Sequence, residues 1–171
     1  MAIRDAMLPE LEREAALTRQ LLERVPDTKL DWKPAEKSMS LNQLASHLAN
    51  LPSWGLHALE SDELDINPPG GEPMVPASPE GVAAIVELFD SNVAKLRETI
   101  ASTEDEALGL LWTLKSGGEE VFSLPKYGVL RGMVLNHIIH HRGQLTVYLR
   151  LNDVPLPMTY GPSADETGGF Q

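Results

Sequence analysis

Apolar residues recur three and four positions apart in four long segments of the chain. These segments are 7–25, 40–59, 79–101 and 125–151. The spacing predicts an amphipathic helix in each of them. Ser40, with Gln43 three residues later, has the pattern of a capping box and predicts the start of the second helix. Ser78 followed by Pro79 predicts an N-cap and the first residue of the third helix.

The connections between these predicted helices carry signals of their own. Residues 61–78 contain four prolines and two glycines, which predict a long loop without regular structure. Further along, residues 110–115 and 119–124 flank Ser116-Gly117-Gly118, a pattern that predicts a short hairpin. The tail 155–171 is rich in proline and glycine and is expected to pack loosely.

Together these elements predict one domain over residues 1–171 with an all-α fold. The expected architecture is a four-helix bundle with a long crossover loop and a small hairpin before the last helix. That last helix has apolar residues around nearly its whole circumference. Such a helix is either buried on several sides, or buried on one side and paired with a second copy of the chain on another.

Composition and charge narrow the classes of function. The chain has 25 acidic and 14 basic residues, a formal net charge of −11, so neither nucleic acid nor a membrane surface is expected as a partner. It has no cysteine, which excludes disulfides, thiolate metal sites and cysteine nucleophiles. It shows neither a signal peptide nor an apolar run long enough to span a bilayer, so a cytoplasmic location is expected.

Three of the five histidines lie in the run 136–145, inside the last predicted helix. His137 and His141 are four residues apart, which places them about 40° apart around a helix axis and about one turn apart along it. Two imidazoles at this spacing can converge on one metal ion. His47, in the second predicted helix, offers a third imidazole from a facing element, and three histidines leave positions open for water or substrate.

A simpler interpretation stays open, because buried histidines can be satisfied by hydrogen bonds alone. His57 has no partner at metal-binding spacing and is expected to face solvent or a loop. His140 points to a different sector of its helix from His141 and is expected to make a hydrogen bond or an interface contact. The spacing does not identify the metal either, since imidazole suits zinc, nickel, iron and copper alike.

Several catalytic motifs do not occur in the sequence. No glutamate lies three residues before a histidine, which excludes the di-iron bundle pattern. Ile138 stands where a His-Glu-x-x-His protease has its general base. Neither a phosphate-binding P-loop nor a Gly-x-Ser-x-Gly motif is present. No general acid or base can be assigned, so the catalytic residues stay unnamed.

Three parts of the sequence together resemble the DinB-like superfamily of metal-binding four-helix bundles. They are the segment 40–48, which holds His47, the pair His137-x3-His141, and the stretch Arg142-Gly143-Gln144-Leu145 that follows it. Residues 30–34 before the second helix and 152–161 after the last helix extend the resemblance over nearly the whole chain. The His-His-Arg-Gly-Gln stretch is the most specific part of the resemblance.

The resemblance implies that His47, His137 and His141 bind a divalent metal, nickel or zinc, in a homodimer that acts on a small-molecule substrate. Some relatives use a low-molecular-weight thiol as cosubstrate. The first hypothesis is therefore a metal-dependent thiol S-transferase or hydrolase that activates a thiol or water. The second is a non-catalytic dimeric bundle that binds metal or ligand, such as a stress-response binding module. Arg142 is expected to form a structural salt bridge rather than to orient an anionic substrate.

Overall fold

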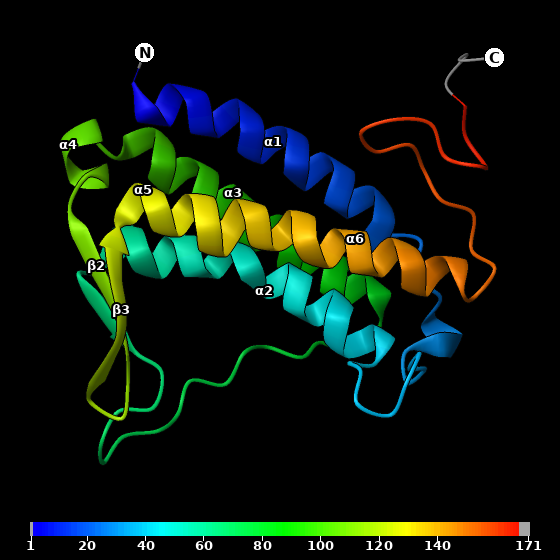
Figure 1. The fold of residues 1–171 in the computed structure, drawn as a ribbon, viewed down its shortest axis with the longest axis horizontal. Helices are drawn as coiled ribbons and strands as arrows, with labels where there is room; N and C mark the ends of the chain where they lie inside the picture. The colour runs from blue at the N-terminus through cyan, green and yellow to red at the C-terminus, as the bar shows by residue number, and fades with distance from the viewer. Residues whose placement is uncertain (1, 168–171) are drawn as a thin grey trace.

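The structure, a computed structural model, describes residues 2–167 of the chain. Its long helices lie side by side along the molecule (Figure 1). They are α1 (Ile3–Leu22), α2 (Leu41–Glu60), α3 (Val82–Ser102) and a last helical rod made of α5 (Lys126–Val129), a π-helical segment (Leu130–Asn136) and α6 (His137–Arg150). The shorter helical elements are a 3₁₀ turn (Asp27–Lys29) and α4 (Asp105–Leu108). The four predicted helical segments are confirmed.

Two of these helices begin where a distant aspartate caps them, and the predicted starts were wrong for that reason. α1 begins at Ile3 instead of residue 7, because the Asp105 carboxylate in α4 accepts from the Ile3 backbone N–H at 2.7 Å. α3 begins at Val82 instead of Pro79, because Asp27 accepts from the Val82 backbone N–H at 2.8 Å. A carboxylate at a helix N-terminus satisfies an unpaired donor and complements the helix dipole.

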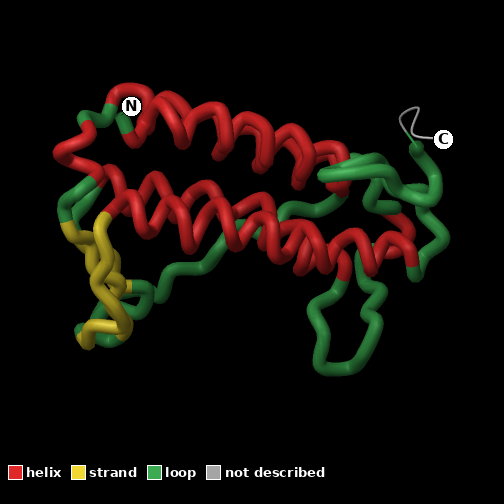
Figure 2. Tube along the Cα trace, turned by 45° about the horizontal axis from the view of Figure 1, so that its top comes forward, coloured by secondary structure: helices red, strands yellow, loops and turns green. Residues whose placement is uncertain are grey.

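A three-stranded sheet lies at one end of the bundle (Figures 1 and 2), so the fold is mostly helical, as predicted, but carries one strand more than the predicted hairpin. The predicted hairpin is confirmed as β2 (Leu111–Ser116) and β3 (Glu119–Pro125), which pair antiparallel. β1 (Glu63–Asp65) adds to β2 in parallel, inside the segment predicted to lack regular structure. The Asp65 carboxylate fixes this edge by accepting from the backbone N–H groups of Gly117 and Gly118, at 3.1 and 2.7 Å.

The main hydrophobic core lies between the long helices, and a smaller cluster lies between the bundle and the sheet. The smaller cluster contains Ala58, Trp112, Leu114 and Val129. Trp112 is fully buried there. Gly55 lets α2 approach its neighbours closely, because a Cβ at this position would lie 2.7 Å from a methyl group of Leu96.

Residues 66–80, called the strap below, run from the sheet back along the bundle to the start of α3 (Figures 1 and 2). Asn50 of α2 tethers the strap, because its side-chain N–H groups donate to the carbonyls of Ala77 and Ser46, each at 2.7 Å. The strap therefore lies close to the middle of α2.

The C-terminal tail, which was expected to pack loosely, makes several contacts within its described part. Tyr160 donates to the buried carboxylate of Glu14 at 2.7 Å, and Glu166 pairs with Arg24 at 2.6 Å. Leu156 packs against the main core. Within residues 2–167, none of the helices combines the length and the apolar character that a membrane span requires.

Candidate metal site

The three histidines singled out in the sequence lie together where α2 faces α6. His47 comes from the first half of α2, and His137 and His141 occupy the first two turns of α6. The ring centroid of His47 lies 5.0 Å from that of His137 and 4.4 Å from that of His141. The centroids of His137 and His141 are 4.7 Å apart. One nitrogen from each ring lies within 4.8 Å of the others. The structure thus brings together all three predicted ligands.

The donor geometry fits a small divalent ion. The Nε2 atoms of His47 and His137 are 3.4 Å apart. Two imidazole nitrogens bound at zinc-like distances and tetrahedral angles lie about 3.4 Å from each other. His47 and His137 are partly buried and His141 is 9% exposed, so the cluster lies near the surface. No aspartate or glutamate joins the ligand cluster within residues 2–167.

The surroundings keep the three imidazoles neutral. Burial, together with the neighbouring rings of His141 and His137, lowers the pKa of His47 to about 4. Burial likewise lowers the pKa of His137 and the pKa of His141. Neutral rings offer lone pairs to a cation at neutral pH, whereas protonated rings cannot bind one.

Hydrogen bonds orient two of the rings toward the shared centre. Gln144 accepts from Nδ1–H of His141, with the two atoms 2.7 Å apart, and this tautomer leaves Nε2 free as a ligand. A ring N–H of His137 bonds the backbone carbonyl of Met133. The amide Nε2 of Gln144 also lies 3.2 Å from Nε2 of His140. His140 stays outside the cluster. Gln144 was named as part of the sequence motif without a role, although its position three residues after His141 indicates that the two side chains can meet on a helix.

A π-helical segment directly precedes His137. It spans Leu130–Asn136, and the backbone N–H of His137 bonds the Val134 carbonyl. A π-helical turn holds more residues than an α-helical one, so it changes which face of the rod the following residues occupy. Such turns are frequent at functional sites. The apolar periodicity gave no sign of this segment.

Arg142 and His57 lie away from the cluster. Arg142 forms the predicted structural ion pair, with Nη2 placed 2.6 Å from Oε2 of Glu14 and both side chains at most 5% exposed. The arginine also donates to the Glu14 backbone carbonyl at 3.1 Å, which joins α6 to α1 one residue after His141. His57 follows His47 on α2 by almost three turns and is partly buried.

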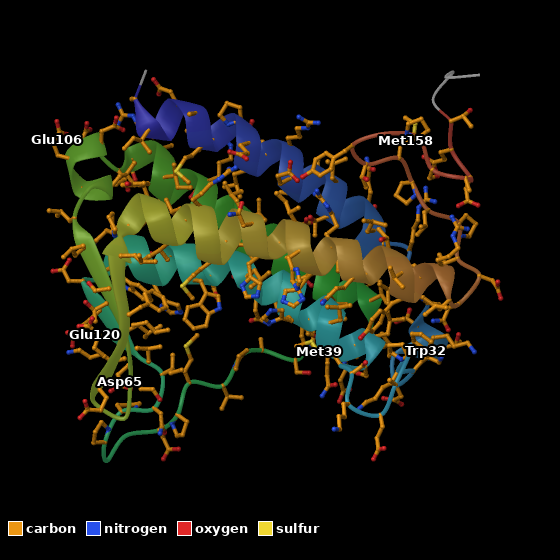
Figure 3. All side chains as sticks on the ribbon, in the orientation of Figure 1. Trp32, Met39, Asp65, Glu106, Glu120 and Met158 are labelled. Carbon is orange, nitrogen blue, oxygen red and sulfur yellow. The ribbon has the colours of Figure 1, made fainter. Side chains whose placement is uncertain are left out.

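A cavity of about 510 Å³ borders His47. The start of α2, the residues before it and the strap form its walls. Its lining residues are Lys37, Ser38, Met39, Gln43, Ser46, His47, Asn50, Pro76, Ala77 and Ser78. Figure 3 shows Met39 beside the N-terminal end of α2, far from Asp65 at the sheet. The loop predicted over residues 61–78 borders this cavity through Pro76, Ala77 and Ser78, whereas the part of the wall formed by α2 is not evident from the sequence.

Comparison with known proteins assigns the family. The sequence matches the DinB superfamily over residues 10–145, so the chain belongs to that superfamily. It is 27% identical over 169 residues to the uncharacterized protein YrdA of Bacillus subtilis (strain 168), a match that covers 97% of this chain and 93% of YrdA.

Solved structures share the fold. A DinB-like protein from Bacillus cereus ATCC 10987 superposes with a TM-score of 0.70 at 21% identity, covering 91% of this chain and 97% of the other. YfiT from Bacillus subtilis gives a TM-score of 0.68 at 15% identity, with 88% of each chain covered. YfiT is described as a probable metal-dependent hydrolase with an unusual four-helix bundle topology.

Proposed function

We propose that this protein is a metal-dependent enzyme in which His47, His137 and His141 hold one divalent ion, nickel or zinc. The ion would activate a thiol or a water molecule, as in a thiol S-transferase or a hydrolase. The observation that carries the proposal is the convergence of three neutral imidazoles, with donor atoms within 4.8 Å of one another. Three neutral ligands preserve the double charge of the ion, which lowers the pKa of a bound water or thiol.

The chain's own residues prepare this chemistry. Gln144 and the Met133 carbonyl hold two rings in the tautomer that presents a lone pair to the centre. YfiT, which shares the fold, is described as a probable metal-dependent hydrolase, and this description supports hydrolysis as the activity of the proposed enzyme. Because this sequence has no cysteine, a thiol nucleophile would come from a small cosubstrate.

A second candidate function is a non-catalytic bundle that binds metal or ligand. One observation favours it: none of the residues that line the cavity is an aspartate or glutamate that could act as general acid or base. Pairing of two copies through α6 stays a prediction. Val147 and Leu151, at and just beyond the end of α6, are 57% and 58% exposed and would be available for such contact.

Turnover assays separate the two candidates. The protein loaded with nickel or zinc is incubated with an electrophile and either a low-molecular-weight thiol or water alone, beside a His47→Ala variant. The enzyme hypothesis predicts product formation that requires the metal and disappears in His47→Ala. A His57→Ala variant is the matched control, because His57 lies on the same helix outside the cluster. Bound metal without turnover across thiols and electrophiles would support the binding bundle instead.

A further inference from the structure

His140 is the exposed neighbour of His141 and lies outside the cluster of three rings. Its ring nevertheless lies edge-on to the ring of His141, with the two centroids 4.8 Å apart and the planes at 75°. Gln144 follows His140 by four residues and His141 by three. On an α-helix both spacings bring side chains into contact, so the amide of Gln144 can bond both rings at once.

The two ends of the Gln144 amide bond different histidines. Its oxygen Oε1 lies 2.7 Å from Nδ1 of His141, and its nitrogen Nε2 lies 3.2 Å from Nε2 of His140. An amide oxygen only accepts hydrogen bonds, and an amide nitrogen only donates them. His141 therefore carries its proton on Nδ1, and Nε2 of His140 accepts through its lone pair.

The orientation of this amide decides whether His141 can bind a metal. In the orientation of the structure, the proton on Nδ1 leaves Nε2 of His141 with a lone pair for the ion. With the amide turned over, its NH₂ group would face Nδ1, and a neutral His141 would carry its proton on Nε2. A ring nitrogen that carries a proton cannot bind a cation. The contact with His141 does not choose between the two orientations, because a neutral imidazole can donate to the oxygen or accept from the nitrogen.

We propose that His140 is a positioning residue for the metal site and that it acts through Gln144. Nε2 of His140 accepts from the amide nitrogen of Gln144 and so keeps the amide oxygen on Nδ1 of His141. With the amide turned over, its oxygen would face the lone pair of His140 unless both imidazoles exchanged tautomers. This inference rests on the proposed function in one respect, because it takes His141 to be a metal ligand.

The test measures the tautomer of His141 in the metal-free protein. Nitrogen NMR of the isotope-labelled chain, at a pH where free histidine is neutral, distinguishes a ring nitrogen that carries a proton from one that does not. The wild type is expected to hold the proton of His141 on Nδ1, and His140→Ala to show a mixture of both tautomers. His57→Ala removes a histidine outside the cluster and is expected to match the wild type. A pure Nδ1–H tautomer in His140→Ala would overturn the proposal.

Two substitutions of opposite hydrogen-bonding character sharpen this test. His140→Glu supplies only acceptors when ionised, so it is expected to keep the proton of His141 on Nδ1. His140→Lys supplies only donors, which attract the oxygen of Gln144, so it is expected to move the proton to Nε2. Because position 140 is exposed, both variants should keep the helical content of the wild type in circular dichroism. Equal tautomer ratios in the two variants would contradict an effect exerted through the amide.

Metal affinity provides a second measure through a double-mutant cycle. His140→Ala is expected to weaken nickel or zinc binding about two- to fivefold, the effect of one solvated hydrogen bond. In a Gln144→Leu background the same substitution is expected to have no effect, because no amide is left to orient. Equal weakening in both backgrounds would show that His140 acts without Gln144 and would overturn the proposal.

The tautomer measurement also separates this inference from the proposed function. If His140 fixes the tautomer of His141 but the wild type retains no metal, the proposed function fails and the orientation of the amide by His140 stands. If the wild type binds metal but the tautomer of His141 ignores every substitution of His140, the metal site stands and the positioning role is refuted.

Discussion

Replacing Arg142 with methionine tests how the structure holds the histidine-bearing helix in place. Arg142 and Glu14 are 3% and 5% exposed, and their charged atoms lie 2.6 Å apart. Methionine fills most of the space of the arginine stem but leaves the Glu14 carboxylate buried, with the Tyr160 hydroxyl as its remaining side-chain donor. Removing one partner of a buried ion pair costs about 3–5 kcal/mol. We expect a loss of this size, a large part of the stability of an ordinary domain.

The assay is urea unfolding followed by circular dichroism, with the slope of the transition checked for constancy. A double variant, Glu14→Gln with Arg142→Met, removes the unpaired charge and is expected to recover a large part of the loss. Arg13→Met is the control, because Arg13 is exposed and, among the residues that the structure describes, its guanidinium stacks over the Tyr160 ring at 5.6 Å without an ion pair. The reasoning fails if Arg142→Met costs less than about 1 kcal/mol, or if the double variant is no more stable than the single one.

Three further changes test other parts of the account. The metal-free protein should lose stability as the pH falls from about 6.5 towards 4, because the pKa of His47 is about 4 when folded and the unfolded chain binds the proton first. Urea midpoints across this range should therefore fall less steeply in His47→Gln, and parallel curves would contradict the assignment. Gln144→Leu should weaken metal affinity about 10- to 100-fold without loss of helical signal, whereas Gln144→Glu should retain binding; unchanged affinity in Gln144→Leu would remove the positioning role. Asp105→Ala should destabilise the protein by about 0.5–2 kcal/mol, because it removes the cap of α1. Asp5→Ala, in the first turn of α1, is the control, and equal effects of the two substitutions would argue against capping.

The helices and the pairing of His137 with His141 could be predicted because both depend on local periodicity. Leu44, Leu48 and Leu51 mark the buried face of α2, and the spacing of His137 and His141 places their rings one turn apart on any helix. That His47 joins them follows from how α2 packs against α6, which spacing within one helix does not reveal.

Features that depend on residues distant in sequence could not be predicted. The starts of α1 and α3 are set by Asp105 and Asp27, and β1 exists because β2 offers it a hydrogen-bonding edge about 50 residues later. The wall that the strap forms beside His47 has the same origin, because it is tethered by the side chain of Asn50. Local sequence patterns do not contain these contacts.

Metal content is the most direct test of the central claim that three imidazoles hold one ion. The protein is purified without added metal, incubated with nickel or zinc, dialysed and analysed for metal per chain, beside alanine variants of His47, His137, His141 and His57. We predict one divalent ion per chain in the wild type and in His57→Ala, and its loss in each of the other three variants, which should remain folded. A wild type that retains no metal, or a His47→Ala variant that retains it with unchanged affinity, would contradict the claim.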